Sequence, residues 1–466
     1  MLDIKRTQKD LNIFEIQKLI DIHRAEIAHY RDLLCMYETK NAIRNRTKQD
    51  DTVPNNKIAH SYANYIVTAS VGYFMGRPIG YSFPEEYGPL FDDIYKYNDE
   101  SAVNMRIATD CSIFGQAVEM LFMDENSQVR FAPVDITEII VIRHPDVIGD
   151  IHTIIRHWDE EDLVEDRLTT YVEVYYNDRV ERYEYSGYSV SSEPEIEYHP
   201  FNDVPFIVYD NNDSKMGDFE PVIDLINAYD QAQSDTANDF EAFTDCYLEV
   251  KGANLDPEQA QQLKELRVFN FPDADGGIRF VTKDINDSAT ENYKNRLDND
   301  IHKFSFVPNM SDENFASNAS GVAMQYKLAG LNYKTAAKEA LFKKGLLRRI
   351  ELICNILNIT ASEPIDIIKD IAIKFTRNTI DNLVETVDMV NRLTNIISKE
   401  TSIDLLQNII DPELEKERLE KEKELTLTID GKEVAESTVK IIEANRRRLL
   451  QNEEINEDVV NDEEEE

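Results

Sequence analysis

The chain contains 466 residues, of which 42% are hydrophobic, so it is long and apolar enough to build two or more domains with substantial cores. Its 50 lysine and arginine residues are opposed by 90 aspartate and glutamate residues, which gives a formal net charge of −40. Such a surface repels nucleic acid over most of its area, which argues against a protein that grips DNA by neutralising phosphates. DNA could still pass such a surface without adhering to it.

Cysteine spacing and hydropathy narrow the class further. The four cysteines lie far apart in sequence, which excludes a CxxC metal or redox motif and favours free thiols in a reducing compartment. The N-terminus lacks the apolar core of a signal peptide. The longest apolar stretch, residues 65–76, is shorter than the roughly 20 residues that a membrane-spanning helix needs. We therefore expect a soluble intracellular protein without a membrane partner.

The first 220 residues predict one α+β domain. Apolar residues at steps of three and four predict helices over 8–46 and 57–74, and a further helix is expected over 87–112. Gly76 and Pro78 end the second of these. Residues 116–210 change to short β-rich runs separated by turn signals, which predicts an antiparallel meander.

Residues 221–306 predict two long helices around a compact insert. Pro221 occupies a first-turn position and begins a helix that runs to about residue 250, rich in acids and poor in bases. Residues 254–285 read as a small α/β insert with a helix "DPEQAQQLKEL" and strands "RVFNF" and "IRFVTK". A second helix is expected from about 288 to 304. This order is typical of a stalk with a tip.

A loop of small and polar residues follows at 307–320, and then a long helix from Gly321 to about Asn358. Gly330 and Gly345 lie inside that helix, where each costs about 1 kcal/mol relative to alanine, so we expect a kink or a close packing contact at each. One face of the helix is apolar, with a phase slip after Ala340. A strand is expected at 370–376, helices at 377–398, 401–409 and 411–424, and a disordered acidic tail at the end.

No catalytic constellation is evident in the sequence. The phosphate-binding GxxxxGK[ST], the dinucleotide-binding GxGxxG after a strand, and the hydrolase motifs HExxH and GxSxG are all missing. The histidines are scattered, and His152 and His157 should point to opposite faces of one strand. We predict no enzyme activity, no cofactor and no metal site.

The long helix carries an unusual charge. Between Ser320 and Asn358 there are seven bases and two acids, giving a local charge of +5 in a chain of −40. Three interpretations are open. The bases could neutralise acidic neighbours, such as the helix over 221–250 of the same or an adjacent subunit. They could contact polyanionic DNA, or they could form a solvated face.

Three segments resemble a known family. The stretches "PNNKIAHSYANYIVTASVGYFMGRPIGYS" (54–82), "DNNDSKMGDFEPVIDLINAYDQAQSDTANDFEAFTDCYLEVKG" (210–252) and "ASGVAMQYKLAGLNYKTAAKEALFKKGLLRRIELI" (319–353) resemble, in family order, phage portal proteins of the SPP1 type from tailed phages of Gram-positive bacteria. Beyond residue 380 only the helical character agrees.

The resemblance implies a twelve-subunit ring at one vertex of the capsid, with a central channel through which double-stranded DNA is packaged and ejected. It implies docking of the terminase large subunit and of head-completion or connector proteins, and contact with major capsid and scaffolding proteins. It places the protein in the virion, and in the host bacterial cytoplasm during assembly.

The resemblance also divides the chain. It implies a wing (1–220), a first stem helix (221–250), a clip (251–286), a second stem helix (287–306), a tunnel loop (307–320), a long kinked helix (321–358), a wing return strand (359–376), a helical crown (377–424) and a C-terminal extension with the acidic tail (425–466).

Residues expected to line the channel follow from the same resemblance. The tunnel loop would project Asn309, Asp312, Glu313, Asn314, Phe315, Ser317 and Asn318 towards DNA. Phe315 could instead anchor the loop against its neighbour. Lys327, Lys334 and Lys338 are candidates for facing the lumen, since steps of seven and four keep one helical face. The resemblance thus predicts a passive portal. The alternatives are a non-ring scaffold or adaptor protein and, less favoured, a metal-dependent nuclease.

Overall fold

The computed structural model describes residues 1–406, 415–416, 418–419 and 421, with gaps at 8–9, 50–52, 163–166, 187–188, 191–192, 245–246, 252–257, 259–276, 282–286, 311–320, 360–364, 366, 378–389 and 394–395. The chain divides into two compact units, Met1–Thr379 and Ile380–Glu466. Helix α11 (Lys399–Leu405) belongs to the second unit, and the elements described below belong to the first.

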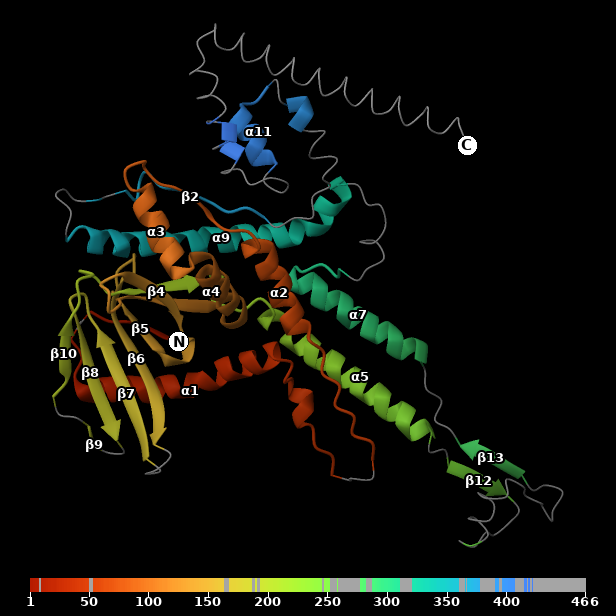
Figure 1. Cartoon of the computed structure of the whole chain (residues 1–466). Coiled ribbons are helices and arrows are strands. Elements are labelled where there is room, and N and C mark those ends of the chain that lie inside the picture. The colour runs from red at the N-terminus through yellow and green to blue at the C-terminus, as the bar shows by residue number, and fades with distance from the viewer. Residues whose placement is uncertain are drawn as a thin grey trace, which may run out of the picture. The chain divides into compact units, whose positions relative to one another are not determined.

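The fold of the first unit is α+β, as the sequence predicted (Figure 1). Its helices are α1 (Ile13–Tyr37), α2 (Tyr62–Met75), α3 (Gly88–Asn98), α4 (Glu100–Phe114), α5 (Ile223–Thr244), α7 (Asp287–Ser305) and α9 (Gly321–Leu357), with short 3₁₀ turns η1 (Ala42–Asn45), η2 (Ile136–Glu138) and η3 (Glu220–Val222). No helix among the described residues combines the length and the apolar character needed to cross a membrane.

Among the described residues, the strands form a large sheet and three smaller ones. The large sheet has the order β1-β5-β6-β7-β8-β10, with β9 paired to β8, and a second sheet has the order β11-β3-β4. The bounds are β1 (Leu2–Lys5), β2 (Gly80–Ser82), β3 (Gln116–Met123), β4 (Val129–Val134), β5 (Ile139–Arg143), β6 (Ile151–Asp162), β7 (Arg167–Tyr175), β8 (Arg179–Ser186), β9 (Ser189–Val190), β10 (Glu195–Tyr198), β11 (Phe206–Asp210), β12 (Tyr247–Lys251), β13 (Gly277–Val281) and β14 (Ala372–Lys374).

The antiparallel meander predicted for residues 116–210 is present in β5 to β8. Strand β1 joins it in parallel with β5, a pairing that the sequence did not predict. Successive residues of β5 alternate between two apolar layers. Ile140 and Ile142 pack towards α1, while Ile139 and Val141 pack towards β3 and β11. The large sheet is therefore buried on both faces around β5, with α1 across one of them (Figure 1), whereas its edge strand β10 is exposed.

Several boundaries differ from the prediction. The helix expected over 87–112 is two helices, because Asp99 adopts a left-handed conformation (φ 49°) between α3 and α4. The helix expected to run from Pro221 to about residue 250 ends at Thr244, and Tyr247–Lys251 is a strand paired with β13. The other predicted insert elements, at 256–266 and 267–271, lie outside the described residues except Glu258. So do the acidic tail, the loop at 311–320 and most of the C-terminal helices.

The strand predicted at 370–376 is present as β14, which pairs with β2 and so brings the chain back to its N-terminal part. The two glycines inside α9 are explained by close packing. A Cβ atom at Gly345 would lie 2.3 Å from Tyr209 Cε1, and one at Gly330 would lie 3.2 Å from Phe306 Cδ1. Each glycine therefore lets an aromatic ring approach the helix backbone, as its position predicted.

Candidate functional site

The elements that flank the predicted loop meet at one place, which we call the junction. It comprises the end of α7, residues 306–310 after it, Asp218 shortly before α5, and the middle of α9. Residues 311–320 connect the two sides of the junction and lie outside the described residues. The described contacts on either side fix the chain that leads into and out of this segment.

The entry to the loop is tied to α2. The hydroxyl of Tyr65 donates to the carbonyl oxygen of Pro308 (2.7 Å) and accepts the backbone N–H of Met310 (3.0 Å). One turn earlier, Tyr62 donates to Asp298 on α7 (2.6 Å). Both tyrosines belong to the segment 54–82 that drew the comparison with a known family. Their part in the structure is to fix the end of α7 and the chain that leaves it.

The exit side is tied through a buried ion cluster around Asp218, which is 2% exposed. Lys338 of α9 lies 2.5 Å from one carboxylate oxygen, and Lys334, one turn away, lies 3.2 Å from the other. Lys338 also donates to the hydroxyl of Ser112 on α4 (2.8 Å), and Lys334 donates to the carbonyl of Ser305 at the end of α7 (2.9 Å). We call Asp218, Lys334, Lys338, Ser112 and Ser305 the Asp218 cluster. It joins α4, α7, α9 and the approach to α5.

The electrostatics of this cluster follow from its burial. Burial alone would raise the pKa of Asp218, but the ammonium groups of Lys338 and Lys334 hold it well below the usual range. Burial lowers the pKa of Lys334, and the nearby carboxylate opposes that effect. The carboxylate is therefore charged at neutral pH, and carbonyl and hydroxyl oxygens provide further hydrogen-bond partners for the two lysines.

Helix α5 is held along its length by a second set of polar contacts. Its buried residues at four-residue intervals accept hydrogen bonds from alternate backbone N–H groups of the extended segment 53–60. These bonds join Asp230 Oδ1 to His60 N (2.9 Å), Ser234 Oγ to Ile58 N (2.9 Å) and Asn238 Oδ1 to Asn56 N (2.7 Å). Four helical residues rise about 6 Å and two extended residues rise about 6.6 Å, so the spacings match.

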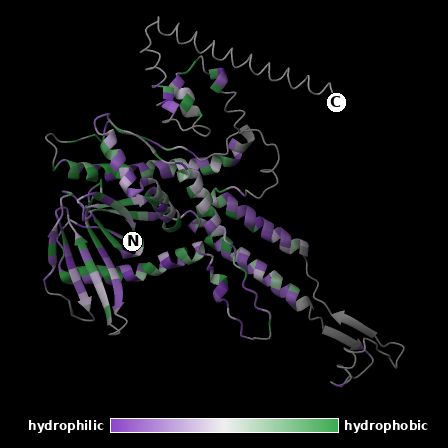
Figure 2. Cartoon of the chain, viewed as in Figure 1, coloured by the Kyte–Doolittle hydropathy of each residue, from purple (hydrophilic) through white to green (hydrophobic). Residues whose placement is uncertain are grey.

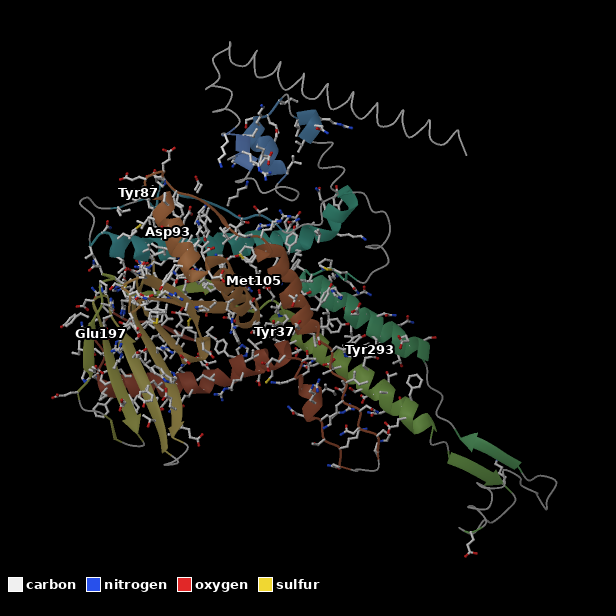
Figure 3. The ribbon with its side chains drawn as sticks, in the orientation of Figure 1. Tyr37, Tyr87, Asp93, Met105, Glu197 and Tyr293 are labelled. Carbon is white, nitrogen blue, oxygen red and sulfur yellow. The ribbon has the colours of Figure 1, made fainter. Side chains whose placement is uncertain are left out.

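Helices α5 and α7 lie side by side (Figure 1). The buried Lys294 of α7 donates to Gln233 of α5 (2.9 Å), and Leu297 and Ile301 of α7 are buried. The rest of α7 is largely hydrophilic (Figure 2). Tyr293, labelled in Figure 3, is nevertheless 50% exposed. The two helices therefore meet along a narrow contact, and most of α7 is exposed in the single chain.

The structure places the predicted site residues unevenly. Asp312, Glu313, Asn314, Phe315, Ser317 and Asn318 lie outside the described residues. Asn309 is described, and its side chain donates to Asp298 of α7 (3.3 Å), so it belongs to the anchored entry of the loop. Lys327 is half-buried on α9.

The side chain of Lys338 is buried against Asp218, which argues against the lumen-facing position expected for it. Lys334 lies in the same cluster with its side chain 16% exposed, and the same argument applies to it. Sequence reasoning had placed both on one helical face, which is correct. It did not identify the acid that this face meets.

Two of the four remaining bases of α9 have acidic partners within the chain. Arg349 is fully buried and contacts Glu119 on β3 (2.8 Å), while Arg348 pairs with Asp203 (2.6 Å). Thus four of the seven bases neutralise acids, one of the interpretations left open above. The acids are not those of α5, however, because Asp218, Asp203 and Glu119 all precede that helix.

Asp218 and the tyrosines of α2 are functional candidates that sequence reasoning missed. The available signal for Asp218 was its place between Gly217 and Pro221, directly before a helix start. A Cβ atom at Gly217 would lie 2.4 Å from the carbonyl oxygen of Ile113, so this glycine brings Asp218 against α4. Within the described part of the chain, no group of three or more His, Cys, Asp or Glu residues is placed to hold a metal ion.

Comparison with known proteins adds the remaining observation. A model of the family "Phage portal protein, SPP1 Gp6-like" matches residues 16–426. The chain belongs to this family. It is 24% identical over 434 residues to the portal protein of Bacillus phage SPP1, covering 87% of this chain and 86% of that protein. It is 24% identical over 417 residues to the portal protein of Clostridium phage phiCD119, covering 82% and 90%.

Family membership supports a phage portal role, with its packaging and capsid functions. Portal proteins are structural components of the virion, and membership of the portal family implies an oligomeric assembly associated with the capsid. The segments that carried the resemblance are now seen to meet, because the first and the third contact the end of α7 and the second contributes Asp218.

Proposed function

We propose that this protein forms the ring-shaped channel at one capsid vertex, through which double-stranded DNA is packaged and ejected. On this proposal it is a conduit and a docking platform, without an enzymatic role of its own. Terminase, head-completion proteins, capsid and scaffolding proteins would dock on it. Assembly would take place in the cytoplasm of the bacterial host. The observation that carries the proposal is the match of the portal family over residues 16–426.

The arrangement of the described elements supports this function. Helices α5 and α7 lie side by side and lead to the paired strands β12 and β13, which suits a stem with a clip at its tip. Residues 311–320 leave an anchored junction, which suits a loop held at a defined place beside the channel. The charge of −40 would keep DNA from adhering to the wall of that channel.

The divisions of the chain are proposed with it. We assign α1 to α4 and strands β1 to β11 to the wing, α5 and α7 to the stem, β12 and β13 to the clip, residues 307–320 to the tunnel loop and β14 to the return into the wing. The crown would begin after residue 377.

Negative-stain electron microscopy of the purified protein tests the ring. Uniform rings with a central hole are expected, and a twelvefold count is expected for the form in the virion. Monomers that persist at all salt and protein concentrations would contradict the proposal. A scaffold or adaptor would form no such ring, and a nuclease would cleave DNA when a divalent metal is added.

The loop is tested separately. Deletion of residues 312–317 should leave rings intact and impair DNA packaging, because the ends of the loop are held by contacts outside the deletion. A matched variant replaces the same six positions with glycine and serine at unchanged length. Normal packaging by the deletion variant would exclude a role for the loop, and normal packaging by the replacement alone would show that its length matters more than its side chains.

A further inference from the structure

The long helix α9 leaves one of its apolar stripes uncovered. Tyr326, Gly330, Tyr333, Ala337 and Ala340 follow one another at steps of four, three, four and three, which places them on one face. We call these five residues the α9 seam. Tyr326 is 80% exposed and Tyr333 is 76% exposed. Large aromatic side chains on a helix-packing repeat are normally covered, so this stripe is typical of an interface.

Phe306 extends the seam at its centre. It follows the last residue of α7 with φ 61°, a left-handed conformation that is unusual for a bulky side chain and is commonly taken by glycine at this position. The ring contacts α9 at Gly330, where a Cβ atom would come within 3.2 Å of it, yet 55% of Phe306 remains exposed. A strained backbone thus presents an aromatic ring that the single chain does not cover.

The charges around the seam indicate what covers it. The five seam residues are themselves uncharged. Along the first two-thirds of α9, Lys334 and Lys338 belong to the Asp218 cluster, Glu339 is paired with Arg377, and Lys327 is half-buried. The exposed charges that continue along the helix, Lys343 and Lys344, are positive.

Helix α5 has the complementary character, with exposed acids at Asp224 and Glu241 and an exposed aromatic ring at Phe240, while its exposed Asp235 pairs with Arg46 of the same chain. Two copies of a chain with a charge of −40 repel each other, so they can associate only where negative charge is absent or is opposed by positive charge.

We propose that the α9 seam, with Phe306, is an interface that receives the acidic α5–α7 pair of a second copy of this chain. The inference rests on the proposed ring and deepens it by naming the two faces that meet. Because the two faces differ, the contact is heterologous, the type that closes into a ring when repeated with rotation. Two seams facing each other would instead oppose like charges at Lys343 and Lys344.

Duplex DNA is a poorer occupant of the seam. Its bases are stacked inside the helix, and its phosphates seek lysine and arginine rather than tyrosine and alanine. A protein surface, which can present apolar side chains between its acids, fits the stripe better.

The first test measures assembly. The variant Tyr326→Ser/Tyr333→Ser should need at least tenfold more protein than the wild type to form the same oligomer in sedimentation velocity and native mass spectrometry. Tyr198→Ser is the matched control, because Tyr198 on β10 is 74% exposed, and it should assemble like the wild type. Both tyrosines of the seam are exposed, so circular dichroism should show unchanged folding.

The second test identifies the partner face. The photoreactive residue p-benzoylphenylalanine is placed at position 333 of the full chain and activated in the assembled state. The expected cross-linked peptide comes from residues 223–244 or 287–305 of another copy. A cross-link confined to the large sheet, or to DNA in particles that contain it, would overturn the inference.

The outcomes separate this inference from the proposed function. If the wild type forms rings and the double variant forms them equally well, the seam is not the interface and the portal ring stands. If the wild type never forms rings, the proposed function fails and this inference fails with it.

Discussion

Replacing Asp218 with asparagine is the sharpest test of the junction. The substitution keeps the size of the side chain and removes its charge, leaving the ammonium groups of Lys334 and Lys338 buried without an anion. The new amide would also present an N–H donor towards a lysine or towards the amide of Asn211, which now donates to the carboxylate (3.0 Å). Breaking a buried ion pair in this way costs about 3–5 kcal/mol.

The same magnitude follows from the lysines. A buried lysine that loses its counter-ion can escape by giving up its proton. At pH 7.5 this costs roughly 1.36 kcal/mol for each of about three pH units, or about 4 kcal/mol for one lysine. With two lysines present, one can stay charged against the carbonyl of Ser305 and the hydroxyl of Ser112. We therefore expect a loss of about 4 kcal/mol. The first unit, Met1–Thr379, has an unfolding entropy of about 0.8 kcal/mol/K, so the melting temperature should fall by roughly 5 °C.

The assay is urea unfolding of D218N against the wild type, with D203N as the control. Asp203 also pairs with an arginine of α9, but it lies at the surface with its side chain 36% exposed, so its loss should cost less than about 1 kcal/mol. Burial lowers the pKa of Lys334, and in D218N the carboxylate no longer opposes that effect, so the unfolded state binds more protons than the native state. The deficit should then shrink as pH rises from 7 towards 10. Equal stability of D218N and wild type would refute the reasoning.

Two further substitutions probe the packing of the first unit. Gly345→Ala should destabilise it by about 1–3 kcal/mol, because the new methyl group would overlap Tyr209. Gly72→Ala in α2 is the control and should be neutral or slightly stabilising, because no atom lies within 4 Å of the added Cβ. Thermal unfolding of both variants and the wild type measures the difference. Burial lowers the pKa of His23 to about 3 and that of His157 to about 4, and His23 Nδ1 lies 2.7 Å from His157 Nε2. Both histidines are neutral in the native state and charged in the unfolded state below pH 6.5, so the free energy of unfolding falls as pH falls from 6.5 towards 4. In urea unfolding, His23→Leu should reduce the loss of stability between pH 7 and pH 5 by about 2 kcal/mol. An unchanged dependence of stability on pH would exclude this pair as its source.

Local periodicity predicted the elements that depend on neighbouring residues. The bounds of α7 and α9 agree with the prediction within about two residues, and the strands of the meander and β14 lie where alternation placed them. Non-local pairings were missed. Strand β1 depends on β5, about 140 positions away, and β12 depends on β13 across the insert, so neither pairing leaves a local pattern. Tyr247–Lys251 in particular was predicted as the end of the acidic helix, but in the structure it is a strand because it pairs with β13.

Charge was harder to interpret than hydropathy. The acids of α5 suggested a uniformly negative wall, yet Asp230 is buried and accepts hydrogen bonds from His60 and Asn41. The bases of α9 suggested contact with DNA, yet Lys338 and Arg349 are committed to acids within the chain. A charge in a sequence has no visible partner, because ion pairs join residues that are distant along the chain. Composition therefore gives the net charge, whereas the fold decides which charged side chains are exposed and which are paired.

The junction makes the three family segments, 54–82, 210–252 and 319–353, depend on one another, because residues from each of them meet there. The loop at 307–320 leaves from contacts with Tyr65 and Asp298, and it returns to a helix fixed by Lys334, which also bonds the carbonyl of Ser305 where α7 ends. Lys334 contacts both Ser305 at the end of α7 and Asp218 before α5. A displacement of α5 or α7 therefore changes the contacts that fix α9, the helix that follows the loop. Side chains within the loop are then not the only determinants of its position. A variant of Asp218 that still folds should change packaging although residues 311–320 are untouched, and unchanged packaging by such a variant would separate the junction from the loop.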